Sequence, residues 1–94
     1  MSFKREKRVD FSHVVRALLT LLRAEKEGRE LSMTEFIRES GIPSSTFYTT
    51  VRDALIDLGL ITVESNPRER VVIIKLTEKG RKLARCIEEA GIEV

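Results

Sequence analysis

The stretch from Ser32 to Leu60, SMTEFIRESGIPSSTFYTTVRDALIDLGL, decides the fold. Ser32 followed three residues later by Glu35 is a capping box, which predicts that a helix begins here. Gly41 is placed to end this helix in a left-handed conformation, and the Ile-Pro pair after it predicts a turn. Ser44 is then positioned to cap a second helix. Two helices joined by so short a turn indicate a helix-turn-helix.

The second helix has two unlike faces when its residues are projected at about 100° per residue. The apolar face, which we expect to pack on the rest of the domain, contains Phe47, Val51, Ala54, Leu55 and Leu58. The opposite face and its flanks contain Ser45, Thr46, Tyr48, Thr49, Arg52, Asp53 and Ile56. Because hydroxyl groups bond to phosphates and base edges, and arginine is the commonest specific reader of guanine, the outer face is a candidate reader of DNA.

A plainer interpretation of the same helix stays open. Serine and threonine gather at helix starts for capping alone. In that case Ser44, Ser45 and Thr46 only cap the helix, and Thr49 and Thr50 are neutral filler.

The composition indicates one small folded domain. The chain has 94 residues, of which 41% are hydrophobic and 34% are charged, and this excludes a disordered chain. No apolar run approaches the length of a membrane span, and the start has no signal-peptide apolar region. We therefore expect a cytoplasmic protein without a membrane partner. A core this small is marginal, so oligomerisation is an expected source of stability.

Positive charge is concentrated at the start of the chain. The net charge of +2 is too small to argue for nucleic acid, but Lys4, Arg5, Lys7 and Arg8 lie close together. Residues 1–9 lack helical periodicity and are predicted to form a basic flexible arm, which leaves residues 10–94 as the domain. The arm is either a solvated tail or a DNA contact through Lys4 and Arg5 to phosphates or a minor groove.

The remaining elements flank the helix-turn-helix. Apolar residues at helical spacing predict a first helix that begins at Asp10 or Ser12 and ends near Lys26. Arg16 and Thr20 of this helix lie away from its apolar stripe. Leu31 is placed either as a hydrophobic staple or as a very short strand before the capping box.

A hairpin and a last helix follow. Residues 61–64 and 71–76 are rich in β-branched side chains and predict two strands around the loop 65–70. Arg68 and Arg70 in that loop are either incidental or contacts of a wing to DNA. Thr77 is the expected N-cap of the last helix. The apolar stripe of that helix contains Leu83, Ala84, Ile87 and Ala90, and Gly80 suggests close approach of another backbone.

Histidine and cysteine, which often form catalytic or metal sites in proteins, form no recognisable site in this sequence. His13 is the only histidine and is interpreted as a surface or dimer-facing residue, and Cys86 is the only cysteine. We expect no catalysis, no metal site and no cofactor. Cys86 is either an inert thiol or half of an interchain disulfide. Such disulfides occur inside hyperthermophiles, and the high Lys, Arg and Glu content without glutamine is the thermophilic bias.

Three passages carry a resemblance to a known superfamily. VRDALIDLGLI at 51–61, IKLTEKGR at 74–81 and the helix-turn-helix entry at 32–44 resemble MarR-like and PadR-like winged helix-turn-helix regulators, over roughly residues 10 to 90. The compact length is similar to that of small winged-helix proteins of archaea and their viruses. The resemblance implies an α+β fold with a three-helix core, a two-stranded wing and a C-terminal helix. It further implies a homodimer that contacts DNA through Ser44, Ser45, Thr46, Tyr48, Thr49, Arg52, Arg68 and Arg70.

The function expected from these features is transcriptional regulation. We predict a sequence-specific reader of double-stranded DNA that acts as a homodimer through its first and last helices and represses by occluding a promoter. The missing extra helices of the MarR pattern argue against small-molecule sensing. The main alternative is a winged-helix module that binds protein, which the modest charge and Ile56 favour. A protein that binds DNA without sequence preference is a further alternative.

Overall fold

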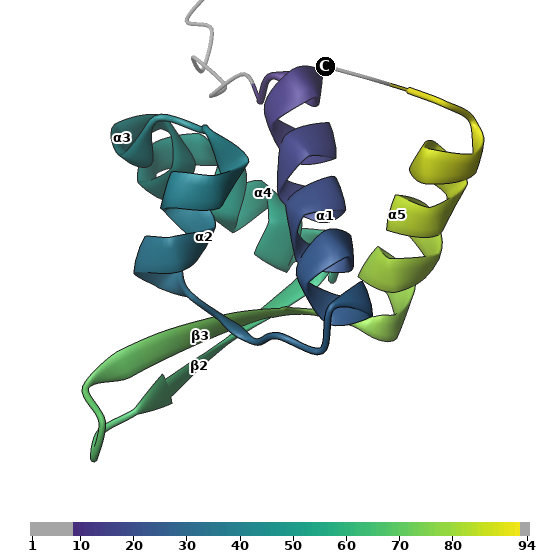
Figure 1. The fold of residues 1–94 in the computed structure, drawn as a ribbon. Coiled ribbons are helices and arrows are strands. Elements are labelled where there is room, and N and C mark those ends of the chain that lie inside the picture. The colour runs from purple at the N-terminus through teal and green to yellow at the C-terminus, as the bar shows by residue number, and fades with distance from the viewer. Residues whose placement is uncertain (1–8, 93–94) are drawn as a thin grey trace, which may run out of the picture.

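The computed structural model of the protein describes residues 9–92. In chain order its elements are α1 (Phe11–Lys26), β1 (Leu31–Ser32), α2 (Met33–Ser40), α3 (Ser44–Thr46), the π-helical turn η1 (Phe47–Val51), α4 (Arg52–Asp57), β2 (Ile61–Asn66), β3 (Val71–Leu76) and α5 (Glu78–Glu89). The helices gather at one end of the hairpin β2–β3, whose tip projects away from them (Figure 1). The predicted α+β winged helix-turn-helix is confirmed.

Helix α1 is at the centre of the core. Asp10 caps it, because its Oδ1 accepts hydrogen bonds from the Ser12 N–H at 2.9 Å and the Ser12 hydroxyl at 2.8 Å. α2 and α5 both pack on α1 and lie on either side of it in Figure 1. The prediction that Thr20 lies outside the buried face is therefore wrong: with helices packed on two sides, Thr20 is only 8% exposed.

The sheet has three antiparallel strands in the order β1-β3-β2. Leu31 pairs with Ile74, so the residue before the capping box is a short strand. β2 runs to Asn66 instead of ending near residue 64. The reason is local: the Asn66 Oδ1 accepts hydrogen bonds from the N–H groups of Arg68 at 3.0 Å and Glu69 at 3.4 Å, which closes the turn beyond the expected strand end.

Thr77 ties the start of α5 to the chain that leaves the helix-turn-helix. Its hydroxyl accepts a hydrogen bond from the Gly80 N–H at 3.0 Å and donates to the Gly59 carbonyl at 2.6 Å. Its own N–H donates to the Leu60 carbonyl at 3.0 Å. Gly80 is buried against that same Leu60 carbonyl, which confirms the expected close approach of a backbone.

Helix α5 buries a narrower stripe than predicted. Ala84 and Ile87 are buried, but Leu83 is 40% exposed and Ala90 is exposed. α5 packs on α1 and on β3, and its outer side has no neighbour within the described chain. An ion pair from Lys26 of α1 to the Glu88 carboxylate, at 2.6 Å, helps to hold the two helices together.

Candidate nucleic-acid interface

The predicted helix-turn-helix entry is present. The Ser32 hydroxyl accepts from the Glu35 N–H and the Glu35 carboxylate accepts from the Ser32 N–H, both at 3.2 Å, and Gly41 has a φ of 72°. The capping prediction for Ser44 is wrong. Pro43 is the N-cap, and its carbonyl accepts the first helical hydrogen bond at 2.9 Å. Ser44 is therefore already inside the helix and makes no side-chain cap bond.

Three elements, α3, η1 and α4, form one recognition helix with a π-helical turn in its middle. The buried side chains on its inner face are Phe47, Val51 and Leu55, all 0% exposed. They are four residues apart, and in a regular α-helix such a series rotates by about 40° per step. The wider π turn offsets this rotation and keeps all three side chains toward the core. π turns inside helices are frequent at functional sites.

The threonine hydroxyls of the recognition helix bond to its own backbone. Thr49 Oγ1 donates to the Ser45 carbonyl at 2.8 Å, and Thr50 Oγ1 donates to the Thr46 carbonyl at 2.9 Å. These bonds lie where the π turn interrupts the regular hydrogen-bond pattern. A hydroxyl that donates to the backbone can contact DNA by accepting from a donor on the base or by rotating away from its carbonyl partner.

The outer side of the recognition helix carries the predicted DNA-contacting residues. Ser44, Ser45, Tyr48 and Thr49 are exposed, and Thr46 and Arg52 are half-buried. We call these six residues the reading face. The Arg52 guanidinium lies 5.4 Å from the centre of the Tyr48 ring, and Arg52 Nε lies 3.6 Å from the Asp53 carboxylate. The ring and the carboxylate hold the arginine on the outer side instead of leaving it free in solvent.

The end of the recognition helix differs from the sequence projection. Leu58 was expected in the core but is 54% exposed. The helix ends at Asp57 with Leu58 as its C-cap, and Gly59, with a φ of 71°, turns the chain so that Leu60 enters the core instead. The Leu60 N–H donates to the Leu55 carbonyl at 2.9 Å, as in a Schellman ending.

The wing places two arginines at its tip, residues 67–70. Arg68 and Arg70 are exposed, and neither has an ion-pair partner within residues 9–92. Arg70 has a φ of 53°, a left-handed conformation that is uncommon for arginine. In Figure 1 the wing tip and α3, the start of the recognition helix, both lie on the side of α1 opposite α5. The two predicted contact regions therefore share one side of the molecule.

One face of the wing is acidic. Lys75 lies between two carboxylates, at 2.7 Å from Glu30 and 3.6 Å from Glu64, and Glu69 lines the same hollow. The hydrogen bond to Glu30 is the main reason why the pKa of Lys75 is raised. The carboxylates outnumber the cation, so phosphates are disfavoured on this face. A DNA backbone would meet the tip of the wing rather than its acidic face.

Sequence reasoning missed one cation of the helix-turn-helix. Arg38 is exposed on α2, one turn after the exposed Thr34, and forms no ion pair among the described residues. The available signal was that the first helix of a helix-turn-helix crosses the DNA backbone. Lys4 and Arg5, the predicted arm contacts, lie outside the described residues.

The remaining candidate residues form no second site. Cys86 is an exposed free thiol on α5. His13 is half-buried, and its Nδ1 has no hydrogen-bond partner in the described chain. Residues 9–92 contain no group of three or more His, Cys, Asp or Glu arranged to hold a metal ion.

None of the described helices has both the length and the apolar character needed to cross a membrane.

Comparisons with known proteins agree with this architecture. The chain belongs to the family of ArnR1-like winged-helix domains, which matches residues 4–93. No curated protein matches it. Among solved structures it is similar to a protein of Archaeoglobus fulgidus, with a TM-score of 0.74, 20% identity and 87% of each chain covered.

Two further similar structures belong to proteins described as binding DNA. Sso10a-2, a DNA-binding protein of Sulfolobus solfataricus, has a TM-score of 0.60 and 24% identity over 81% of this chain and 75% of its own. FabT of Streptococcus pneumoniae, solved in complex with DNA, has a TM-score of 0.65 and 19% identity over 94% of this chain and 58% of its own. At these identities the likeness establishes the shared fold.

Proposed function

We propose that this protein is a transcriptional regulator that binds double-stranded DNA in a sequence-specific manner. The observation that carries the proposal is Arg52, which is held by the Tyr48 ring on the outer side of the recognition helix. An oriented guanidinium suits the two acceptors of guanine in the major groove. The exposed hydroxyls of Ser44 and Ser45 lie at the N-terminal end of the same helix, where contacts to phosphates and base edges are common.

Affinity and specificity come from different parts of this surface. Arg68 and Arg70 at the wing tip and Arg38 on α2 contact phosphates, and Lys4 and Arg5 of the arm extend the same contact. These contacts supply salt-dependent affinity without sequence information. The reading face supplies discrimination, about 1–3 kcal/mol for each good base contact. FabT, which shares the fold and was solved with DNA, supports DNA binding by this fold.

We further propose that the protein acts as a homodimer through α1 and α5. Leu83, Cys86 and Ala90 follow one another at helical spacing on the exposed side of α5. Phe11, at the start of α1, is 62% exposed. Pairing these surfaces in two subunits would bury them and place two recognition helices on a pseudo-palindromic site. Repression by occlusion of a promoter then needs no ligand and no catalytic step.

A protein-binding module is the second candidate. Ile56 is 44% exposed at the end of the outer side of the recognition helix, and the wing has an acidic face. Apolar exposure of this kind is typical of a protein contact rather than of a phosphate contact.

Salt dependence separates these two functions. The experiment is fluorescence anisotropy of the full chain with a duplex of about 20 base pairs of mixed sequence, at about 50 mM and about 200 mM salt. A regulator with several phosphate contacts loses affinity steeply between the two conditions. Absence of binding at low salt would reject DNA binding and favour the protein-binding module.

A further inference from the structure

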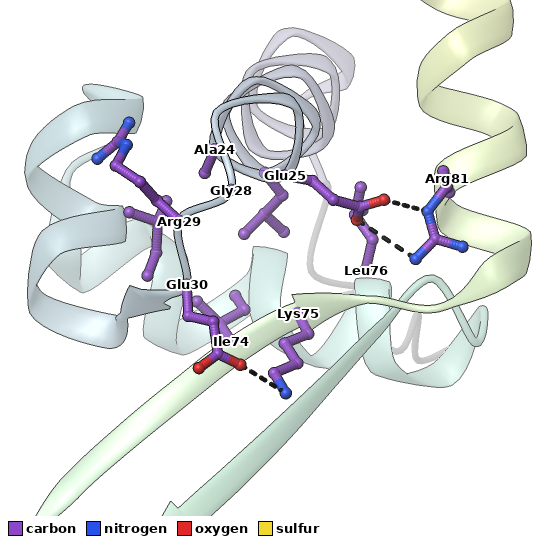
Figure 2. Close-up of a pocket in the computed structure, with 11 residues that line it drawn as sticks. Ala24, Glu25, Gly28, Arg29, Glu30, Ile74, Lys75, Leu76 and Arg81 are labelled. Carbon is purple, nitrogen blue, oxygen red and sulfur yellow. Dashed lines mark hydrogen bonds and ion pairs between the residues drawn. The ribbon is translucent and has the colours of Figure 1, made fainter.

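A pocket adjoins the acidic hollow at the wing base and shares Glu30 and Lys75 with it. It is open to solvent and has a volume of about 370 Å³ between the end of α1, the loop to β1, strand β3 and the start of α5 (Figure 2). Its floor is apolar and consists of four buried side chains, Leu21, Leu31, Ile74 and Leu76. A volume of this order is within the usual range of small-molecule sites in proteins.

Two ion pairs form the rim of this pocket. Glu25 of α1 accepts hydrogen bonds from the Arg81 guanidinium of α5, and Glu30 lies 2.7 Å from the Lys75 ammonium of β3. Figure 2 shows these two pairs at different edges of the opening, with Arg29 directed away from it. Arg29 bonds to Glu27 and Glu39 outside the pocket. The rim therefore offers two carboxylates and two cations around an apolar floor.

The charge pattern of the rim selects the chemistry of a ligand. A ligand with one charge would bond to one member of an ion pair and leave the other member without its partner. A ligand with both charges can insert into one pair, its carboxylate bonding to the cation and its ammonium to the carboxylate, so that every charged group keeps a partner of opposite sign. Its uncharged part must be apolar to cover the leucine and isoleucine floor.

From this geometry we propose that the pocket binds a small zwitterion with an apolar side chain, of the class of the branched or aromatic α-amino acids. The carboxylate bonds to Arg81 or Lys75, the ammonium bonds to Glu25 or Glu30, and the side chain packs on the floor. The two cations come from α5 and β3, and both carboxylates come from α1 and its following loop.

The same pocket links the wing to the helices. β3 continues into the wing tip, whereas α1 and α5 form the surface proposed for the dimer. A ligand that bonds across α1, β3 and α5 would bias the angle of the wing and so change DNA affinity. This regulatory half of the inference rests on the proposed function, whereas binding of the ligand does not.

The first test uses the wild-type chain and six small molecules. L-leucine and L-phenylalanine are compared with analogues that lack the ammonium, 4-methylpentanoate and 3-phenylpropanoate, and with analogues that lack the carboxylate, 3-methylbutylamine and phenethylamine. In ¹H–¹⁵N NMR titrations we expect an amino acid to shift the amides of Gly28, Leu31 and Lys75. Each analogue should bind at least about tenfold more weakly. Equal binding by an analogue, or the absence of shifts at these amides, would overturn the proposal.

Variants then assign the site. Because the carboxylate bonds to one of the two cations, Arg81→Met or Lys75→Met should weaken binding by about tenfold, whereas Lys82→Met, an exposed neighbour outside the pocket, should leave it unchanged. Circular dichroism melts verify that the variants fold. If a variant does not fold, the comparison of ligand analogues still tests the proposal, because it uses the wild-type chain alone. With DNA present, the amino acid should change the DNA affinity of wild type but not that of the variant that binds the amino acid weakly. Ligand binding by a chain that does not bind DNA would reject the proposed function and keep the site.

Discussion

The carbonyl of Leu60 lies directly over Gly80, so close that a Cβ on residue 80 would be 2.0 Å from the carbonyl oxygen and 2.9 Å from its carbon. The atoms in the way belong to the backbone and cannot rotate aside as a side chain can. Leu60 follows the recognition helix, and Gly80 lies in the first turns of α5. This contact fixes how the recognition helix is placed relative to the proposed dimer surface.

Replacement of Gly80 by alanine should therefore destabilise the fold although alanine favours helix. We expect a loss of about 3 kcal/mol, at the upper end for overpacked sites, because either Leu60 or α5 must move. Urea unfolding of Gly80→Ala measures the loss. The neighbouring exposed variant Lys79→Ala is the control and should change stability by no more than about 0.5 kcal/mol. A Gly80→Ala protein as stable as the control would contradict the packing described for this position.

The wing-tip arginines should govern salt dependence. Removal of one phosphate contact lowers the slope of log affinity against log salt by about 1, independently of sequence. We expect this change for Arg68→Ala when binding is measured over a series of salt concentrations. An unchanged slope would mean that the tip does not contact the backbone.

A substitution at Arg70 can distinguish the effect of its charge on DNA binding from the effect of its backbone conformation on stability. Because its φ is 53°, Arg70→Asn removes the charge but keeps a residue that tolerates the left-handed region. Stability to urea should be unchanged or higher, while DNA affinity falls. If stability falls together with affinity, the arginine is needed for the fold of the wing and not specifically for DNA.

The cap of α1 should make stability depend on pH in the acid range. The hydrogen bond from the Ser12 hydroxyl, followed by that from the Ser12 N–H, lowers the pKa of Asp10 below its ordinary value of 3.8. A carboxyl group whose folded pKa is lowered contributes stability that is complete above its unfolded pKa and is lost as pH falls through the folded pKa. The contribution of Asp10 should thus disappear as the pH falls below about 4.

The variant Asp10→Asn tests this assignment because it keeps a capping oxygen that does not titrate. Its free energy of unfolding should fall less than that of wild type between about pH 5 and about pH 3. Some pH dependence will remain, because the hydrogen bond from Arg29 also lowers the pKa of Glu39. Identical pH profiles for wild type and Asp10→Asn would show that the cap does not contribute.

The proposed dimer depends on the exposed side of α5. Leu83→Glu places two like charges across a symmetric contact, so the variant should be monomeric where wild type is dimeric. Light scattering after size exclusion measures the mass, and Thr34→Glu on the exposed side of α2 is the matched control. A monomeric wild type, or a Leu83→Glu protein that stays dimeric, would remove α5 from the interface.

The local features of the fold follow from the sequence. The capping box of Ser32, the turn at Gly59 and the cap at Thr77 each depend on residues a few positions apart, and all three are present. The features that were missed depend on distant neighbours. Thr20 is buried because helices pack on two sides of α1, and no pattern within α1 shows this.

The site was predictable to a similar extent. Five residues of the reading face lie on the outer side of the recognition helix as projected, because the projection needs only helical geometry; Ser44 was instead predicted to be the cap. The π turn and the bond from Thr49 to Ser45 were not foreseen, since a four-residue spacing of buried side chains is also compatible with a regular helix. The pocket rim was beyond sequence reasoning, because Glu25 and Arg81 meet only through the packing of α1 on α5.

Specific reading of DNA is the central claim, and selection from a pool of random duplex DNA tests it most directly. The wild-type chain and an Arg52→Ala/Thr49→Ala double variant are each selected and sequenced at two salt concentrations. The account predicts enrichment of a pseudo-palindrome with half-sites about one helical turn apart for wild type, and loss of that enrichment in the variant. Equal enrichment by both proteins, or retention of DNA without any enriched sequence, would contradict it.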